Sequence, residues 1–216
     1  MSVPDYPAER ERLAAAARRL GAEGLVLGSS GNVSLRTDDR VLVSPTGGVL
    51  ATLDASDVAA VEIDGRPLPD SPEPTSEIDI HLGAMVRHGA GAVVHTHSPA
   101  ATALSCVVDE VPIVHYGMLA LGGSVPVAPY RTFGTPELAE GVLEALDGRR
   151  AALMASHGAV VLAGDVEEAV ELALLLEWAC DVYWRALQVG TPHVMTEAEQ
   201  QDVIAAFITR NYGARK

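Results

Sequence analysis

The sequence predicts an α/β protein with a sizeable core. Stretches with helical spacing of apolar residues alternate along the chain with short β-branched runs bounded by glycine, serine and proline. Apolar residues make up 48% of the 216 residues, which is enough for a core and excludes a disordered chain. The length fits one domain or two small ones, and we expect a single domain over residues 1–216. The alternation alone favours a parallel, doubly wound sheet.

The helices and strands can be placed from periodicity and from their end signals. We expect helices over residues 7–21, 75–89, 135–148, 165–190 and 196–211, and a helix starting near residue 98. Strands are expected within 25–37, 40–48 and 91–99, with a strand pair in 151–164. The expected end signals are Gly21 as a stop, Ser76 with Asp79 as a capping box, Gly89 as a C-cap, Thr135 before Pro136, Asp165 as an N-cap, and Thr196 with Glu199 as a second capping box.

Composition excludes several classes of function. The formal net charge of −14 argues against a nucleic-acid surface or an anionic membrane partner. No apolar stretch is long enough for a transmembrane helix, and the polar N-terminal sequence favours a cytoplasmic protein. The two cysteines, Cys106 and Cys180, are expected to be small buried residues without a bridge.

Two histidines interrupt the apolar run VVHTHSPAA. Side chains two apart on a strand project to the same face, so His95 and His97 are expected side by side. Buried histidines bonded to backbone are about as common an explanation as a shared metal ion. A metal site needs a third ligand, and His157 in MASHGAVV is the candidate. Three histidines with an open fourth position are typical of a catalytic zinc.

Glu77 begins an expected helix after a proline-rich loop. An acidic residue there is often only a favourable charge at a helix N-terminus. The functional alternative is a carboxylate that binds the metal or moves a proton near it. His81 lies one turn later and could orient Glu77, although a surface or packing role is the commoner outcome. His115 precedes Tyr116 and, on a strand, should face away from it.

Three loops offer hydroxyl groups and free N–H groups to an anion: SSGN (29–32), SPTGG (44–48) and PTSE (74–77). Taken singly, each is a common turn. No P-loop or dinucleotide fingerprint is present in the sequence, so nucleotide binding has little support.

These motifs together resemble the class II aldolase/adducin family. The resemblance is carried by SSGNVS, SPTG, TSE, HTHSP, VHYGMLALGGSVPVAPYRTFGTPELAE and SHGAVV, in matching order from about residue 8 to the C-terminus. It implies a three-layer α/β/α fold with a central mixed, mainly antiparallel sheet, and a C4 homotetramer with sites at subunit interfaces. The implied activity is zinc-dependent cleavage of a ketose 1-phosphate, L-fuculose 1-phosphate or a close analogue, to dihydroxyacetone phosphate and an aldehyde.

The resemblance also implies roles for individual residues. One Zn2+ per subunit would be held by His95, His97, His157 and, in the resting state, Glu77, which also shuttles protons. Tyr116 would exchange a proton on the aldehyde side, Phe133 would line the aldehyde pocket, and Tyr212 would sit on a mobile tail that closes over a neighbour's site. The substrate phosphate would be held by Gly31, Asn32, Thr46, Gly47, Thr75 and Ser76.

Other activities of the same family stay open. They are dehydration of methylthioribulose 1-phosphate and 4-epimerisation of a pentulose phosphate, although epimerases tend to carry aspartate where this chain has Glu77. An adducin-like binding module lacks the metal histidines, so His95, His97 and His157 argue against it. A plain structural metal site would leave the phosphate loops and Glu77 unexplained.

Overall fold

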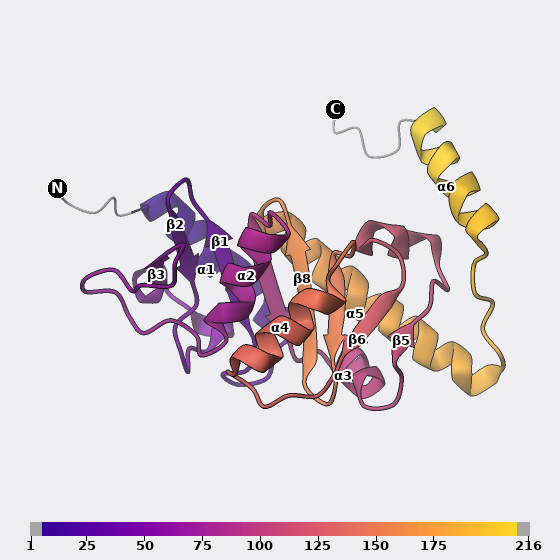
Figure 1. The fold of residues 1–216 in the computed structure, drawn as a ribbon, viewed down its shortest axis with the longest axis horizontal. Coiled ribbons are helices and arrows are strands. Elements are labelled where there is room, and N and C mark those ends of the chain that lie inside the picture. The colour runs from indigo at the N-terminus through magenta and orange to yellow at the C-terminus, as the bar shows by residue number, and fades with distance from the viewer. Residues whose placement is uncertain (1–5, 211–216) are drawn as a thin grey trace.

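The computed structural model describes residues 6–210 and contains one mixed sheet between helices (Figure 1). The strand order is β3-β2-β1-β4-β8-β7-β6-β5, and β6–β7 is the one parallel pair among these strands. The mixed, mainly antiparallel sheet is therefore confirmed, and the parallel arrangement favoured by alternation alone is wrong. The strands are β1 (Asn32–Arg36), β2 (Arg40–Val43), β3 (Ala59–Glu62), β4 (Ala92–Thr96), β5 (Glu110–Val111), β6 (Val125–Ala128), β7 (Ala151–Met154) and β8 (Gly158–Ala163).

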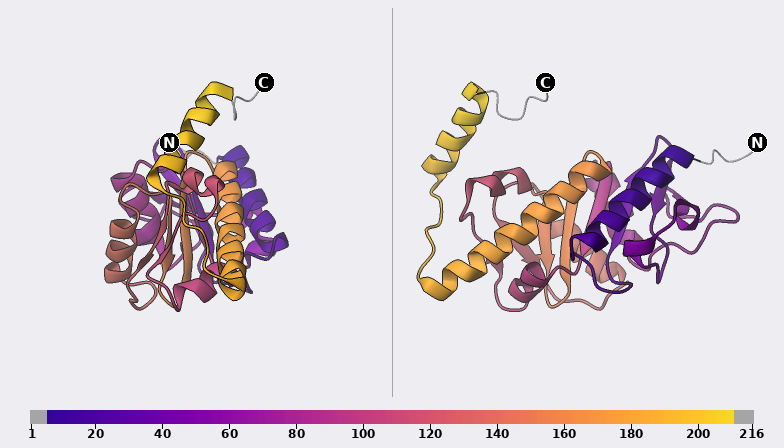
Figure 2. Two further views of the ribbon diagram at one scale, coloured as in Figure 1. Left: turned by 90° about the vertical axis from the view of Figure 1, so that its right-hand side faces the viewer. Right: turned by 180° about the vertical axis from the view of Figure 1, so that it is seen from behind.

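Helices cover the two faces of the sheet, which gives the expected three layers (Figure 2). Strand alternation separates the two cores: Val94 of β4 packs with α1, α3 and α5, whereas Val93 packs with α2 and α4. His95 follows on the Val93 side, so its ring lies on the face that α2 and α4 cover. The helices are α1 (Pro7–Ala22), α2 (Ile78–Arg87), α3 (Pro99–Ser105), α4 (Pro136–Ala145), α5 (Val166–Val189) and α6 (Glu197–Arg210).

Three of the expected helix starts have the predicted side-chain caps. The Thr135 hydroxyl accepts a hydrogen bond from the N–H of Leu138, and the Asp165 carboxylate accepts one from the N–H of Glu168. At α6 the capping box is reciprocal: the N–H of Thr196 donates to Glu199 at 2.7 Å, and the N–H of Glu199 donates back to the Thr196 hydroxyl.

Three end-signal and burial predictions are wrong. Helix α1 passes through Gly21, where a Cβ atom would lie 2.6 Å from Ala51, so this glycine serves close packing rather than a stop. Helix α2 begins at Ile78 with Glu77 in the N-cap position and no side-chain cap, so the Ser76–Asp79 capping box does not form. Cys106 is exposed, because it follows the last turn of α3 at the surface, while Cys180 is buried as expected.

Helix α6 projects beyond the layered body in both views (Figures 1 and 2). None of its residues is buried, and its nearest partner is the 3₁₀ turn η3 (Tyr116–Leu121). Within residues 6–210, no helix has the length and apolar character needed to span a membrane. The cytoplasmic location expected from the sequence stays a prediction.

Candidate active site

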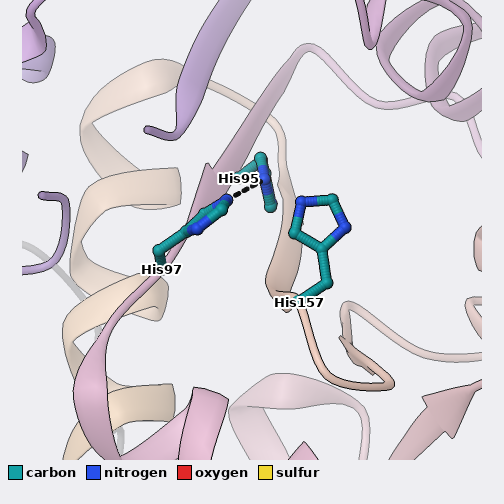
Figure 3. A group of neighbouring side chains, drawn as sticks. All are labelled: His95, His97 and His157. Carbon is teal, nitrogen blue, oxygen red and sulfur yellow. Dashed lines mark hydrogen bonds between the residues drawn. The ribbon is translucent and has the colours of Figure 1, made fainter. Parts of the chain in front are cut away.

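The three histidines singled out in the sequence converge on one point (Figure 3). His95 is the next-to-last residue of β4, His97 directly follows the strand, and His157 lies in the turn that joins β7 to β8. The Nε2 atoms of His95 and His97 are 2.9 Å apart, and one nitrogen from each of the three rings lies within 4.8 Å of the others. Because imidazole nitrogens bind zinc at about 2.0–2.1 Å, such a group can hold one divalent ion.

The turn that presents His157 requires an unusual backbone. Ser156 has φ of 54°, a left-handed conformation that is uncommon for a residue with a side chain. At Gly158 a Cβ atom would lie 2.2 Å from the carbonyl oxygen of Thr96 and 3.3 Å from the His95 ring. Glycine is therefore needed here for β8 to approach β4 beside the histidines.

Hydrogen bonding orients the imidazole of His95, and burial keeps the rings of His97 and His157 neutral, which is the form that binds a cation. Nδ1–H of His95 donates to the carbonyl oxygen of Ala159 at 3.0 Å, which directs the lone pair of Nε2 toward the cluster. Burial, with added repulsion from His95, lowers the pKa of His97 to about 4 and also lowers the pKa of His157. Neutral rings at physiological pH are the form that binds metal.

Glu77 completes the cluster from the start of α2. Its Oε2 lies 3.3 Å from Nε2 of His95, and its Oε1 lies 3.4 Å from Nε2 of His157. Burial alone would raise the pKa of Glu77, but the nearby His95, the hydrogen bond from Asn32, and His157 lower it. Oε1 is buried and has no hydrogen-bond partner among the described residues. A buried, ionised oxygen without a donor fits a metal ligand, so the donor set suits a divalent ion.

A pocket of about 340 Å³ opens beside this cluster. His97, His157 and Glu77 line it, and the three loops expected to bind phosphate line it as well. The structure thus brings together, from separate parts of the chain, the six residues assigned to phosphate: Gly31, Asn32, Thr46, Gly47, Thr75 and Ser76.

The side chain of Asn32 is already engaged. Its Nδ2 donates to Oε2 of Glu77 at 2.8 Å, and its Oδ1 accepts from Nε2 of His81 at 2.6 Å. Sequence reasoning underrated His81, which is fully buried rather than at the surface and is hydrogen-bonded to Asn32. Its spacing of four from Glu77 was the available signal, because such pairs share a helix face.

The proposed aldehyde-side residues separate in space. Phe133 lines the histidine pocket, together with Tyr130 and Arg131, which sequence reasoning missed. Tyr116 is absent from that lining and instead borders a second pocket with Phe207 of α6, their ring centres 6.2 Å apart. Tyr212 lies outside the described residues.

The expectation for His115 is wrong. It is not on a strand but caps η3, where its Nδ1 accepts from the N–H of Gly117. Its ring lies 4.3 Å from that of Tyr116 and 4.7 Å from that of Trp178. In a 3₁₀ turn consecutive side chains do not alternate between opposite faces, which removes the basis of the prediction.

The fold and the site define an α/β protein with a three-histidine, one-carboxylate cluster at the end of a mainly antiparallel sheet. The chain belongs to the class II aldolase and adducin family: the family model for the Class II Aldolase and Adducin N-terminal domain matches residues 11–184.

Relatives with assigned activities match nearly the whole chain. A 5-methylthioribulose-1-phosphate/5-deoxyribulose-1-phosphate aldolase of Rhodospirillum rubrum is 35% identical over 202 residues, covering 93% of this chain and 91% of that protein. The L-fuculose phosphate aldolase of Escherichia coli K12 is 37% identical over 195 residues, covering 89% of each. The solved structure of an L-fuculose 1-phosphate aldolase matches with a TM-score of 0.86 at 28% identity, covering 96% of this chain and 98% of that one. The expected enzyme class, an aldehyde-lyase of the class II aldolase type, is confirmed by these relatives.

Proposed function

We propose that this protein is a zinc-dependent aldolase that cleaves the C3–C4 bond of a ketose 1-phosphate, releasing dihydroxyacetone phosphate and an aldehyde. The observation that carries the proposal is a single pocket with two unlike walls. The metal wall is the part lined by His97, His157 and Glu77, and the phosphate wall is the part lined by the hydroxyl- and glycine-rich loops at 29–32, 44–48 and 74–76. A pocket that combines metal-binding and anion-binding groups suits a substrate with a carbonyl group beside a phosphate.

Each wall has a distinct task in this mechanism. His95, His97, His157 and Glu77 would hold the ion in the resting enzyme, and bound Zn2+ would supply a Lewis acid for the C2 carbonyl group. The loops would fix the C1 phosphate, so that binding energy away from the reaction holds the reacting atoms in place. When the C3–C4 bond breaks, the electron pair stays on C3, and Glu77, displaced by the substrate, would take up a proton from solvent and deliver it to that carbon.

Tyr116 would relay the proton of the C4 hydroxyl group as the aldehyde forms, accepting that proton while its own phenolic proton passes to solvent. Because it borders a different pocket from the histidines, it would do so from a neighbouring copy of the chain. Tyr212 would close over a neighbour's site in the same way. A homotetramer completed at its interfaces is part of the proposal, and the exposed apolar side chains of α6, such as Phe207 and Ile208, support an interface there.

The relatives support two kinds of ketose 1-phosphate as the substrate. The names of the E. coli and R. rubrum proteins give L-fuculose phosphate for the first, and 5-methylthioribulose 1-phosphate or 5-deoxyribulose 1-phosphate for the second. These sugars share the reacting end of the molecule and differ in the aldehyde that is released. The part of the pocket near Phe133 would therefore decide between them.

The test is release of dihydroxyacetone phosphate from each of these three sugar phosphates, coupled to a reductase and followed by loss of NADH. We expect release from at least one sugar, its loss on treatment with a chelator, and its recovery with Zn2+. No release from a folded, zinc-loaded sample would contradict the aldolase proposal. The same sample would then be tested for dehydration of methylthioribulose 1-phosphate and for 4-epimerisation of a pentulose phosphate. A sample that also failed to bind metal would favour the adducin-like binding module.

A further inference from the structure

A buried chain of hydrogen bonds leads from Glu77, through the pocket residue Asn32, into the protein interior. Nδ2 of Asn32 contacts Oε2 of Glu77 at 2.8 Å, Oδ1 of Asn32 contacts Nε2 of His81 at 2.6 Å, and Nδ1 of His81 contacts the Ser34 hydroxyl at 2.7 Å. His81 and Ser34 are both 0% exposed, Asn32 is 5% exposed and Glu77 is 7% exposed. Helix α2 supplies His81, and β1 supplies Asn32 and Ser34 from alternate positions on one face.

The direction of every bond in this chain follows from its carboxylate end. An ionised carboxylate only accepts hydrogen bonds, so Asn32 must turn its NH2 group toward Glu77. The amide oxygen of Asn32 then faces His81, whose Nε2 must carry a proton and donate it. Nδ1 of His81 is left to accept from the Ser34 hydroxyl. A neutral His81 satisfies both contacts. The largest cause of its lowered pKa is burial, which brings the pKa of the ring to about 3 and so favours the neutral form.

The surroundings of His81 argue against a role in packing alone. Its helical neighbours Ile80, Ala84 and Met85 are buried and apolar, and an apolar residue would fill such a position without the desolvation cost of an imidazole. The imidazole instead makes a hydrogen bond with each of its two nitrogens. Both bonds lead to residues of the strand that neighbours β4, which carries His95.

We propose that His81 is a positioning residue for Glu77, acting through the amide of Asn32. By donating to Oδ1 of Asn32 it holds the amide in the orientation that the carboxylate requires, with the NH2 group toward Glu77. Oε2 of Glu77 is then held, and Oε1, which has no hydrogen-bond partner among the described residues, stays on the side of His157, where it would join the ring nitrogens in holding an ion. Without this donor, Oδ1 of Asn32 is buried and unpaired, and the amide no longer has a fixed position from which to hold Oε2. This inference takes the catalytic role of Glu77 from the proposed function. The contact of Glu77 with a metal ion is tested separately, by Zn2+ affinity.

Three substitutions at one position separate the two contacts of His81. Glutamine places its NH2 group near the position of Nε2 and can still donate to Asn32. Asparagine reaches only to the position of Nδ1, near Ser34, and leucine makes neither contact. Ser34→Ala removes the far contact while leaving the His81–Asn32 bond in place. All four variants would be compared with the unaltered protein for Zn2+ affinity, by competition with a chromophoric chelator, and for kcat, KM and unfolding temperature.

We expect His81→Asn and His81→Leu to weaken Zn2+ affinity and to lower kcat by about 10–100-fold, the usual effect of losing a group that orients a metal ligand. KM for the sugar phosphate should change less than kcat, since Asn32 is the one residue of the six assigned to phosphate that is hydrogen-bonded to His81, and His81→Gln should retain most of both properties. Equal Zn2+ affinity in His81→Asn and the unaltered protein would overturn the proposal. So would a His81→Gln variant that folds but is as impaired as His81→Asn. If the unaltered protein binds Zn2+ but cleaves no sugar phosphate, the proposed function fails, while the ranking of Zn2+ affinities still decides the role of His81.

Discussion

The backbone of Gly158 lies directly against the carbonyl group of Thr96, with no room for a Cβ atom between them. A Cβ atom added at Gly158 would lie 2.2 Å from the carbonyl oxygen of Thr96. Because this oxygen belongs to the backbone and not to a flexible side chain, an added methyl group must push β8 away from β4. We expect Gly158→Ala to lower the free energy of unfolding by about 1–3 kcal/mol, measured in urea, and to weaken Zn2+ binding because His95 and His157 flank this contact. Gly141→Ala is the matched control, since Gly141 lies in α4 with open space around it, and it should be neutral or stabilising by up to about 1 kcal/mol. Equal changes in unfolding free energy for the two substitutions would contradict close contact between the backbones of Gly158 and Thr96.

The metal-free protein should lose stability in mild acid. The pKa of His97 is lowered by burial to about 4 in the folded protein, from an ordinary value of 6.5, and the pKa of His157 is lowered in the same direction. Between about 4 and 6.5 the unfolded chain binds more protons than the folded one, so stability rises with pH across this window and levels off above it. The change of unfolding free energy with pH is measured by urea unfolding in the presence of a chelator, at pH values within and above this window. His97→Gln should flatten the dependence of stability on pH, because it removes a buried group that titrates in this window. A stability that falls as pH rises through the window would show that the rings are charged in the folded state.

Arg131 should contribute to substrate binding rather than to catalysis. It is the one lysine or arginine among the described residues that line the histidine pocket, and its guanidinium group donates to the neighbouring carbonyl of Tyr130. A hydrogen bond between this cation and a phosphate is stronger than one from a neutral group. We expect Arg131→Ala to raise KM by about tenfold with little change in kcat, and Arg131→Lys to recover part of the loss because it keeps the charge. Steady-state kinetics on a sugar that the protein cleaves measures both. An unchanged KM in Arg131→Ala would remove Arg131 from the site.

Tyr116 should act in trans. Tyr116→Phe is expected to lower kcat by about 100-fold or more, while Zn2+ affinity stays as it was, because the residue does not line the histidine pocket of its own chain. Co-expression of Tyr116→Phe with His157→Ala should restore part of the activity, since mixed oligomers contain sites with an intact cluster and an intact tyrosine. Co-expression of His95→Ala with His157→Ala is the control and should restore none. A tyrosine that serves its own subunit would give no recovery in either mixture.

Local sequence signals predicted those features that depend on neighbouring residues in the chain. The caps at Thr135, Asp165 and Thr196 form because each hydroxyl or carboxylate reaches an N–H three residues on. The pairing of His95 with His97 follows from strand alternation, although β4 itself ends at Thr96. Those rules do not give strand order, and alternation of helices and strands pointed to a parallel sheet that the structure does not have. The mainly antiparallel sheet was expected from the family resemblance alone.

The remaining errors concern contacts between distant segments. His81 acquires its role only because the buried face of α2 meets alternate residues of β1, more than forty positions away in the sequence. Gly21 was taken for a helix stop because its contact with Ala51 depends on how α1 packs. The expectation that His115 faces away from Tyr116 depends on a strand there, whereas the chain forms a 3₁₀ turn and brings both rings together.

The phosphate wall of the pocket offers backbone N–H groups and hydroxyls, which carry no net charge, and Arg131 is the one lysine or arginine among the described residues that line the pocket. A single cation attracts an anion mainly at close range, while the protein as a whole carries a formal charge of −14. A phosphorylated sugar approaches against this field, and salt screens the repulsion over roughly 10 Å at 0.1 M. Encounter with the substrate should thus become faster as ionic strength rises, the reverse of what an enzyme with a basic entrance shows.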